Sequence, residues 1–118
     1  MPLIEIVIFQ SIKSFFIMVS LQILIGLIIK KVEEVHDYVQ IVFSDGTILS
    51  IFNNYDYDGG SILSVEGKAV KSVDEKEGNI IITLADGKCL SIGMEDDDYN
   101  GPEAMVLKRE GDSPIVWG

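Results

Sequence analysis

The sequence predicts an α+β domain that is predominantly antiparallel β, with one N-terminal helix. One residue pattern occurs twice, 41 positions apart and without a gap. β-branched residues dominate both copies, as is typical of strands. Each copy also contains an Asp-Gly pair between apolar runs, which is a strong hairpin signal. We therefore expect a duplicated three-strand meander followed by a C-terminal hairpin.

The two copies align over residues 26–51 and 67–92, with 10 identities in 26 positions. A duplicated unit must fold the same way twice, so each copy supports the interpretation of the other. With their flanking residues we place the first repeat at 24–60 and the second at 65–101. The identical residues are Gly26, Lys30, Val32, Glu34, Ile41, Asp45, Gly46, Leu49, Ser50 and Ile51 with Gly67, Lys71, Val73, Glu75, Ile82, Asp86, Gly87, Leu90, Ser91 and Ile92.

The segment before the repeats is very apolar, and residues 15–29 carry no charge. A membrane-spanning helix needs about 20 apolar residues, and extending this run backwards would bury Lys13. Two interpretations stay open: a helix packed on the domain, after a short strand at Leu3–Phe9, or a membrane anchor.

Met18 stands just before the repeat begins. Residues 1–17 are therefore either part of the helix or an upstream extension outside the natural domain. Gly26 suits the C-terminal end of a helix, because glycine tolerates a positive φ there.

Each copy is expected to form three strands. The expected strands are Ile28–Val35, Tyr38–Ser44 and Thr47–Asn53 in the first copy, and Ala69–Asp74, Asn79–Ala85 and Lys88–Gly93 in the second. The pairs His36-Asp37 and Gly78-Asn79 mark the first turn of each copy.

The register of the second hairpin in each copy follows from the side-chain pattern. A three-residue loop, Ser44-Asp45-Gly46, pairs Ile41 with Leu49 and gathers the apolar residues on one face. The opposite face is mixed, so we expect it to be half covered, with the N-terminal helix as a candidate cover. The apolar face comprises Val39, Ile41, Phe43, Leu49 and Ile51, and in the second copy Ile80, Ile82, Leu84, Leu90 and Ile92.

The rest of the chain supplies connections and a closing element. Ser61–Val65 is expected to be a short helix between the copies. Ala104–Arg109 and Pro114–Trp117 are expected to form a closing hairpin over residues 104–117. Residues 1–118 then form a single domain, built as an antiparallel sheet or half-open barrel.

Composition and charge limit the classes of partner that the chain can bind. The chain has 118 residues, 47% of them apolar, and a net charge of −10. Such a surface repels phosphate backbones, which argues against nucleic-acid binding, and favours a basic partner. Cys89 is the only cysteine, so no internal disulfide can form, which fits a cytoplasmic location.

The segments after the third strand of each copy are acidic and contain tyrosine. Carboxylates can pair with arginine, and tyrosine is common in protein interfaces. We therefore predict a partner-binding surface made of Tyr55, Asp56, Tyr57, Asp58, Glu95, Asp96, Asp97, Asp98, Tyr99 and Glu103.

No arrangement in the sequence points to catalysis, to a cofactor or to a metal. There is no Ser/His/Asp set, no CxxC pair and no phosphate-binding glycine loop. A calcium loop starting at Asp56 would need a glutamate at its twelfth position, where Gly67 stands. We expect no enzyme activity, no cofactor and no metal site.

A family resemblance rests on motifs spread over residues 18–118. They are Leu24-Ile25-Gly26, Phe43-Ser44-Asp45-Gly46-Thr47-Ile48-Leu49, Asp86-Gly87, Gly101-Pro102-Glu103-Ala104 and the terminal Ile115-Val116-Trp117. The chain thereby resembles small bacterial immunity proteins of polymorphic-toxin and contact-dependent growth inhibition systems.

The resemblance implies a non-enzymatic inhibitor that binds a cognate toxin in the cytoplasm and covers its active site. Many such toxins are nucleases with basic clefts, which the acidic loops would suit. The alternative is a small membrane-anchored accessory or structural domain that uses the apolar segment 15–29. The oligomeric state stays open.

Overall fold

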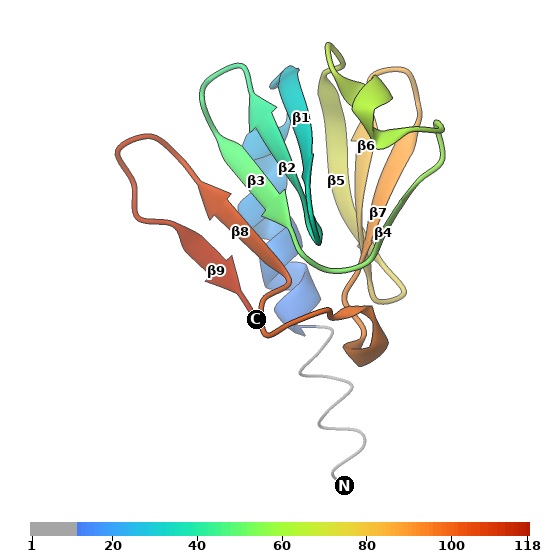
Figure 1. The fold of residues 1–118 in the computed structure, drawn as a ribbon, viewed down its shortest axis with the longest axis vertical. Coiled ribbons are helices and arrows are strands. Elements are labelled where there is room, and N and C mark those ends of the chain that lie inside the picture. The colour runs from blue at the N-terminus through green and yellow to red at the C-terminus, as the bar shows by residue number, and fades with distance from the viewer. Residues whose placement is uncertain (1–11) are drawn as a thin grey trace, which may run out of the picture.

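The computed structural model describes residues 12–118, which form nine strands in two antiparallel sheets with a helix across one side (Figure 1). The expected α+β class, the N-terminal helix and the closing hairpin are confirmed. Two sheets replace the single sheet or half-open barrel that we expected.

Sheet 1 contains β1 (Ile29–Val35), β2 (Tyr38–Phe43), β3 (Ile48–Ile51), β8 (Met105–Lys108) and β9 (Ile115–Trp117), in that order. Sheet 2 contains β4 (Tyr55–Tyr57), β7 (Cys89–Gly93), β6 (Asn79–Leu84) and β5 (Val70–Lys76). Three short 3₁₀ helices are η1 (Leu21–Leu24), η2 (Ile62–Val65) and η3 (Asp96–Asp98). All six strands predicted from the repeat form, with their ends shifted by no more than two residues.

The apolar N-terminal segment is divided among several elements. Residues 12–20 are helical, η1 follows, and Gly26 has the expected positive φ of 90°. Within residues 12–118, no helix combines the length and the apolar character needed to cross a membrane. The strand suggested at Leu3–Phe9 lies outside the described residues.

The helix does not cover the mixed face of a sheet, so that expectation is wrong. Ile17 of the helix, with Leu21 and Leu24 of η1, belongs to the same core cluster as the inner faces of both sheets. Figure 1 shows the helix in blue behind the two sheets. It therefore closes the core on one side, and the outer faces of both sheets remain partly exposed.

The predicted hairpin register is confirmed in both copies. Ile41 pairs with Leu49 and Ile82 with Leu90. The N–H of Phe43 donates to the carbonyl of Thr47 over 2.8 Å, which closes the three-residue loop. All ten residues expected on the apolar face are buried. Burying one such side chain contributes about 1.5–3 kcal/mol, so these two faces supply much of the core.

The two halves are joined by reciprocal hydrogen bonds where β1 and β5 begin. The Gly26 N–H donates to the Val70 carbonyl over 2.8 Å, and the Gly67 N–H donates to the Ile29 carbonyl over 2.7 Å. Gly26 corresponds to Gly67 and Ile29 to Val70 at the interval of 41 residues, so the two bonds are equivalent. The starting corners of both sheets are thereby held together.

The halves also exchange a strand. β4 comes after β3 in the chain but pairs with β7 of sheet 2, and β8 comes after β7 but pairs with β3 of sheet 1. Tyr55 faces Ile92 and Met105 faces Ile51, which are matching positions. The segment around β4, which we expected to be an acidic loop, is thus an edge strand of sheet 2.

Strand direction places the connections at two opposite ends of the molecule (Figure 1). The η3 end contains the turns at 36–37 and 77–78 together with residues 94–103. The η2 end contains the turns at 44–47 and 85–88, residues 58–67 and the turn at 109–114.

Candidate functional site

The ten residues predicted to bind a partner do not form one surface. β4 carries Tyr55, Asp56 and Tyr57 along the edge of sheet 2, and Asp58 lies beyond it at the η2 end. The other six, Glu95 to Tyr99 and Glu103, lie at the η3 end. The length of β4 therefore separates the two predicted acidic segments.

Tyr55 is half-buried and Tyr57 is buried, so neither ring is freely available to a partner. They pair with Ile92 and Leu90, two inner-face residues, so both tyrosines point toward the core. Tyr57 is only 7% exposed, and burial raises the pKa of the Tyr55 hydroxyl. The pattern Tyr-Asp-Tyr was a period-two strand signal that the acidic composition obscured.

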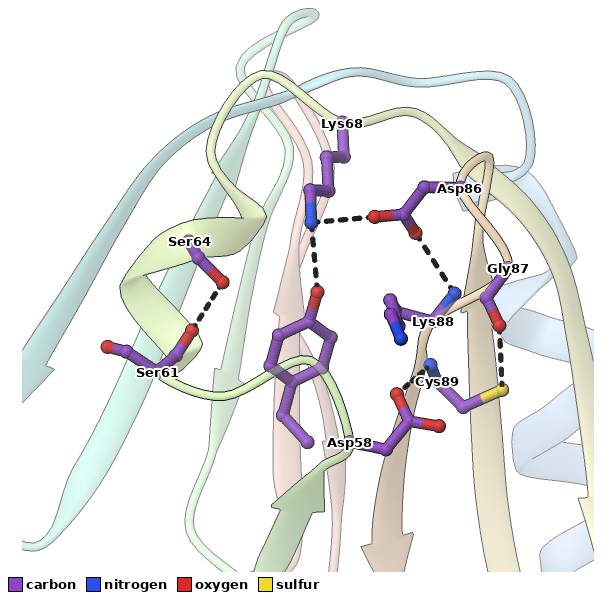
Figure 2. A network of polar contacts seen from close by, with 9 residues as sticks. Asp58, Ser61, Ser64, Lys68, Asp86, Gly87, Lys88 and Cys89 are labelled. Carbon is purple, nitrogen blue, oxygen red and sulfur yellow. Dashed lines mark hydrogen bonds and ion pairs between the residues drawn. The ribbon is translucent and has the colours of Figure 1, made fainter.

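A polar network at the η2 end fixes Tyr57 and Asp58 in place (Figure 2). The ammonium of Lys68 donates to the Tyr57 hydroxyl over 3.1 Å and lies 2.7 Å from the Asp86 carboxylate. The Asp58 carboxylate accepts the N–H of Cys89 over 2.7 Å. These bonds tie the η2 segment and the β6–β7 turn to β4.

The charges of this network compensate each other. Hydrogen bonds from Lys68 to Asp86 and Tyr57 raise the pKa of Lys68. The same ammonium lowers the pKa of Asp86. Each of these side chains bonds to a neighbouring element of the fold, so we interpret the network as structural.

Two of the four acidic residues around η3 support their own backbone. The Glu95 N–H donates to the Asp98 carboxylate over 3.1 Å, and the Glu95 side chain accepts the Asp98 N–H, which forms a capping box. Asp98 also lies against Gly93, where a Cβ would clash with its carboxyl group. Glu95 lies against Gly78 in the same way.

Asp96 and Asp97 are the free members of this segment. Both are exposed, and among residues 12–118 no side chain or backbone group forms a hydrogen bond or ion pair with either carboxylate. Their charges are therefore available to a partner. Tyr99 is not equally available, because its hydroxyl donates to the Gly118 carbonyl over 3.1 Å and its half-buried ring packs against the core.

A pocket of about 390 Å³ opens at the η3 end, and sequence reasoning identified only one of its residues. Asp37, Tyr38, Phe52 and residues 100–103 line it, so Glu103 is the predicted residue that it contains. The rings of Tyr38 and Phe52 lie 4.7 Å apart with a tilt of 33°. The Asn100 amide donates to the Phe52 carbonyl over 2.9 Å and holds the 100–103 wall in place.

A comparison of the two copies would have revealed this pocket. Tyr38 and Phe52 correspond to Asn79 and Gly93, so the aromatic pair has no counterpart on sheet 2. Two large rings at positions where the other copy has asparagine and glycine were a signal of local specialisation.

The two ends differ in charge. The connections at the η3 end carry seven carboxylates and no lysine or arginine, whereas those at the η2 end carry six carboxylates together with Lys88 and Arg109. The η3 carboxylates are Asp37, Glu77, Glu95, Asp96, Asp97, Asp98 and Glu103. The net negative charge is therefore greater at the η3 end than at the η2 end.

Residues 12–118 show no metal-binding geometry. In that part of the chain no three His, Cys, Asp or Glu side chains gather closely enough to hold an ion. Cys89 is half-buried, with its sulfur 3.5 Å from the Thr83 hydroxyl. What the η3 end offers is negative charge beside an aromatic pocket.

No protein-family model, curated protein or solved structure matches this chain. The resemblance to bacterial immunity proteins therefore stays an expectation from sequence motifs.

Proposed function

We propose that the chain is a non-enzymatic binding protein of the immunity type, which neutralises a basic bacterial toxin by covering its active site with the η3 end. The observation that carries this proposal is the charge difference between the ends. Carboxylates accumulate at the η3 end with few lysines, and two of them have no partner among the described residues.

The chemistry suits a cationic protein surface. Exposed carboxylates steer a basic partner toward the η3 end and can accept bidentate hydrogen bonds from arginine. The rest of the scaffold supplies rigidity, because the capping box and the packing of Glu95 and Asp98 hold the η3 segment in one shape. A preorganised surface loses less entropy when it binds.

The test is co-expression with the product of the neighbouring gene. We expect a stable complex and protection of cells from that product's toxicity, with an association rate that falls steeply as salt is raised. A soluble neighbouring product that neither copurifies with the chain nor becomes less toxic in its presence would refute the proposal.

A further inference from the structure

We infer that the pocket between Tyr38, Phe52 and residues 100–103 binds an arginine side chain of a protein partner. This inference rests on the proposed function and deepens it, because it names the group that the η3 end recognises. It concerns the pocket and not the acidic segment at Asp96 and Asp97.

The lining of the pocket selects for a cation with a flat face. Of the described residues that line it, only Asp37 and Glu103 are charged, and neither has an ion-pair partner among residues 12–118. The rings of Tyr38 and Phe52 together supply the aromatic part of the pocket lining. A guanidinium stacks on aromatic rings and forms bidentate bonds with a carboxylate, whereas an ammonium is a compact, strongly hydrated charge.

The loop that forms one wall is fixed before any ligand arrives. The Asn100 amide bridges the Phe52 carbonyl, over 2.9 Å, and the Asn54 side-chain oxygen, over 3.1 Å. Pro102 restricts the backbone of the same wall. Binding would therefore require little rearrangement of the wall, which favours a specific ligand shape.

The face around the pocket points to a protein as the source of the arginine. Tyr38 and Phe52 belong to the outer face of sheet 1, where further apolar side chains remain only partly covered. At five matching positions sheet 2 carries polar or small side chains, although Ile81 replaces Gln40 on the same face. The pairs are Tyr38 with Asn79, Val42 with Thr83, Ile48 with Cys89, Phe52 with Gly93 and Val106 with Asp56. An apolar face beside a charged pocket is typical of a protein interface.

The experiment is an NMR titration of the full chain with N-acetylarginine amide. We expect saturable shifts at Asp37, Tyr38, Phe52 and Glu103, about 10-fold weaker binding of N-acetyllysine amide, and no saturation with the uncharged citrulline analogue. Equal binding of the arginine and lysine probes would overturn the inference.

Two charge-matched double variants separate the pocket from the general field of the protein. Asp37→Asn with Glu103→Gln should weaken arginine binding at least about 10-fold, since both bidentate acceptors are lost. Asp96→Asn with Asp97→Asn removes the same charge from exposed residues that do not line the pocket, and should weaken arginine binding less than about 3-fold, because solvent and salt screen exposed charges. Equal weakening by the two doubles would show that only diffuse attraction is present and would end the inference.

A third variant tests the aromatic contribution without removing charge. Tyr38→Asn installs the residue that the second copy carries at Asn79, in a matching hairpin, and should abolish the preference for arginine over lysine. A retained preference would contradict the role given to the rings.

Failure of the inference and failure of the proposed function give different results. A toxin complex that forms equally well with the Asp37→Asn, Glu103→Gln double variant would disprove the pocket's role and leave the immunity function standing. Specific arginine binding without any complex with the neighbouring product would support the pocket's role and disprove the immunity function.

Discussion

At the η2 end, Lys68 pairs with Asp86 and Arg109 lies 4.0 Å from Asp112, whereas at the η3 end Asp96 and Asp97 have no such partner among the described residues. The two ends are built on matching turns of the same two meanders. Their difference shows that the scaffold leaves carboxylates unpaired at one end and pairs two of them with basic side chains at the other. Interaction chemistry can therefore be altered at the turns without changing the core.

The backbone at the two ends also differs. The hairpin loops at the η2 end place glycines in the left-handed region, with Gly46 and Gly87 both at a φ of 87°. The turns at the η3 end place His36 and Glu77 there, at φ values of 46° and 51°. Side chains other than glycine are disfavoured in this region, so the η3 turns carry strain that the η2 loops avoid.

The largest effect is expected in the core, where the two ends should behave alike. Ile80→Ala near the η3 end and Leu84→Ala near the η2 end each remove a buried inner-face side chain. Each variant should lower the free energy of unfolding by about 2–5 kcal/mol, in a single cooperative transition in urea. A second transition in either variant would mean that the ends do not share one core.

The turns should respond in opposite directions. Gly87→Ala forces a Cβ into the left-handed region and should destabilise the fold by roughly 1–2 kcal/mol. Glu77→Asn should stabilise it by roughly 0.5–1 kcal/mol, because asparagine tolerates that conformation better. Thermal unfolding measures both changes. Glu33→Asn, in extended β1, is the control and should not stabilise the protein.

The smallest effect concerns the ion pair at the η2 end. The folded-state pKa of Asp86 lies below its unfolded value, so its charge contributes stability above about pH 4, the unfolded pKa of an aspartate. That contribution is lost as pH falls through the folded pKa. Asp86→Asn should therefore be slightly less stable than the native chain at pH 6, and the difference should vanish in acid.

Asp45→Asn is the control for the contribution of Lys68, because the matching turn has no lysine. Asp45 occupies the matching turn of the first copy, where Leu27 corresponds to Lys68. The pKa of Asp45 is lowered mainly by a hydrogen bond from the Thr47 N–H. Added salt should reduce the effect of Asp86→Asn more than that of Asp45→Asn, because salt screens an exposed ion pair. Equal salt responses would indicate that the Lys68–Asp86 pair contributes nothing measurable.

The strands, hairpin loops and core faces could be predicted because they follow from local periodicity, which the repeat presents twice. The Ile41–Leu49 register followed from the need to put every apolar side chain on one face. The exchange of β4 and β8 could not be predicted, because which strand completes which sheet depends on contacts distant in sequence. Tyr55–Tyr57 is also only three residues long, too short for its alternation to outweigh its acidic composition.

The candidate site was predicted only in part for a related reason. Composition located the charge at Asp96 and Asp97, but it could not distinguish them from Glu95 and Asp98, whose carboxylates are engaged in the capping box. Tyr38 and Phe52 lie 14 positions apart in sequence, and only the sheet brings their rings together.

The most direct test of the difference between the ends is the affinity for the neighbouring gene's product of two double variants with the same change in charge. Asp96→Lys with Asp97→Lys reverses the free charges of the η3 end. Glu110→Lys with Asp112→Lys makes the same change in charge in an exposed turn at the η2 end, where Asp112 lies 4.0 Å from Arg109. Losing two favourable charge contacts should weaken binding at least about 100-fold in the first variant and less than about 3-fold in the second. An equal loss in both, or a larger loss in the second, would contradict the assignment of the binding surface to the η3 end.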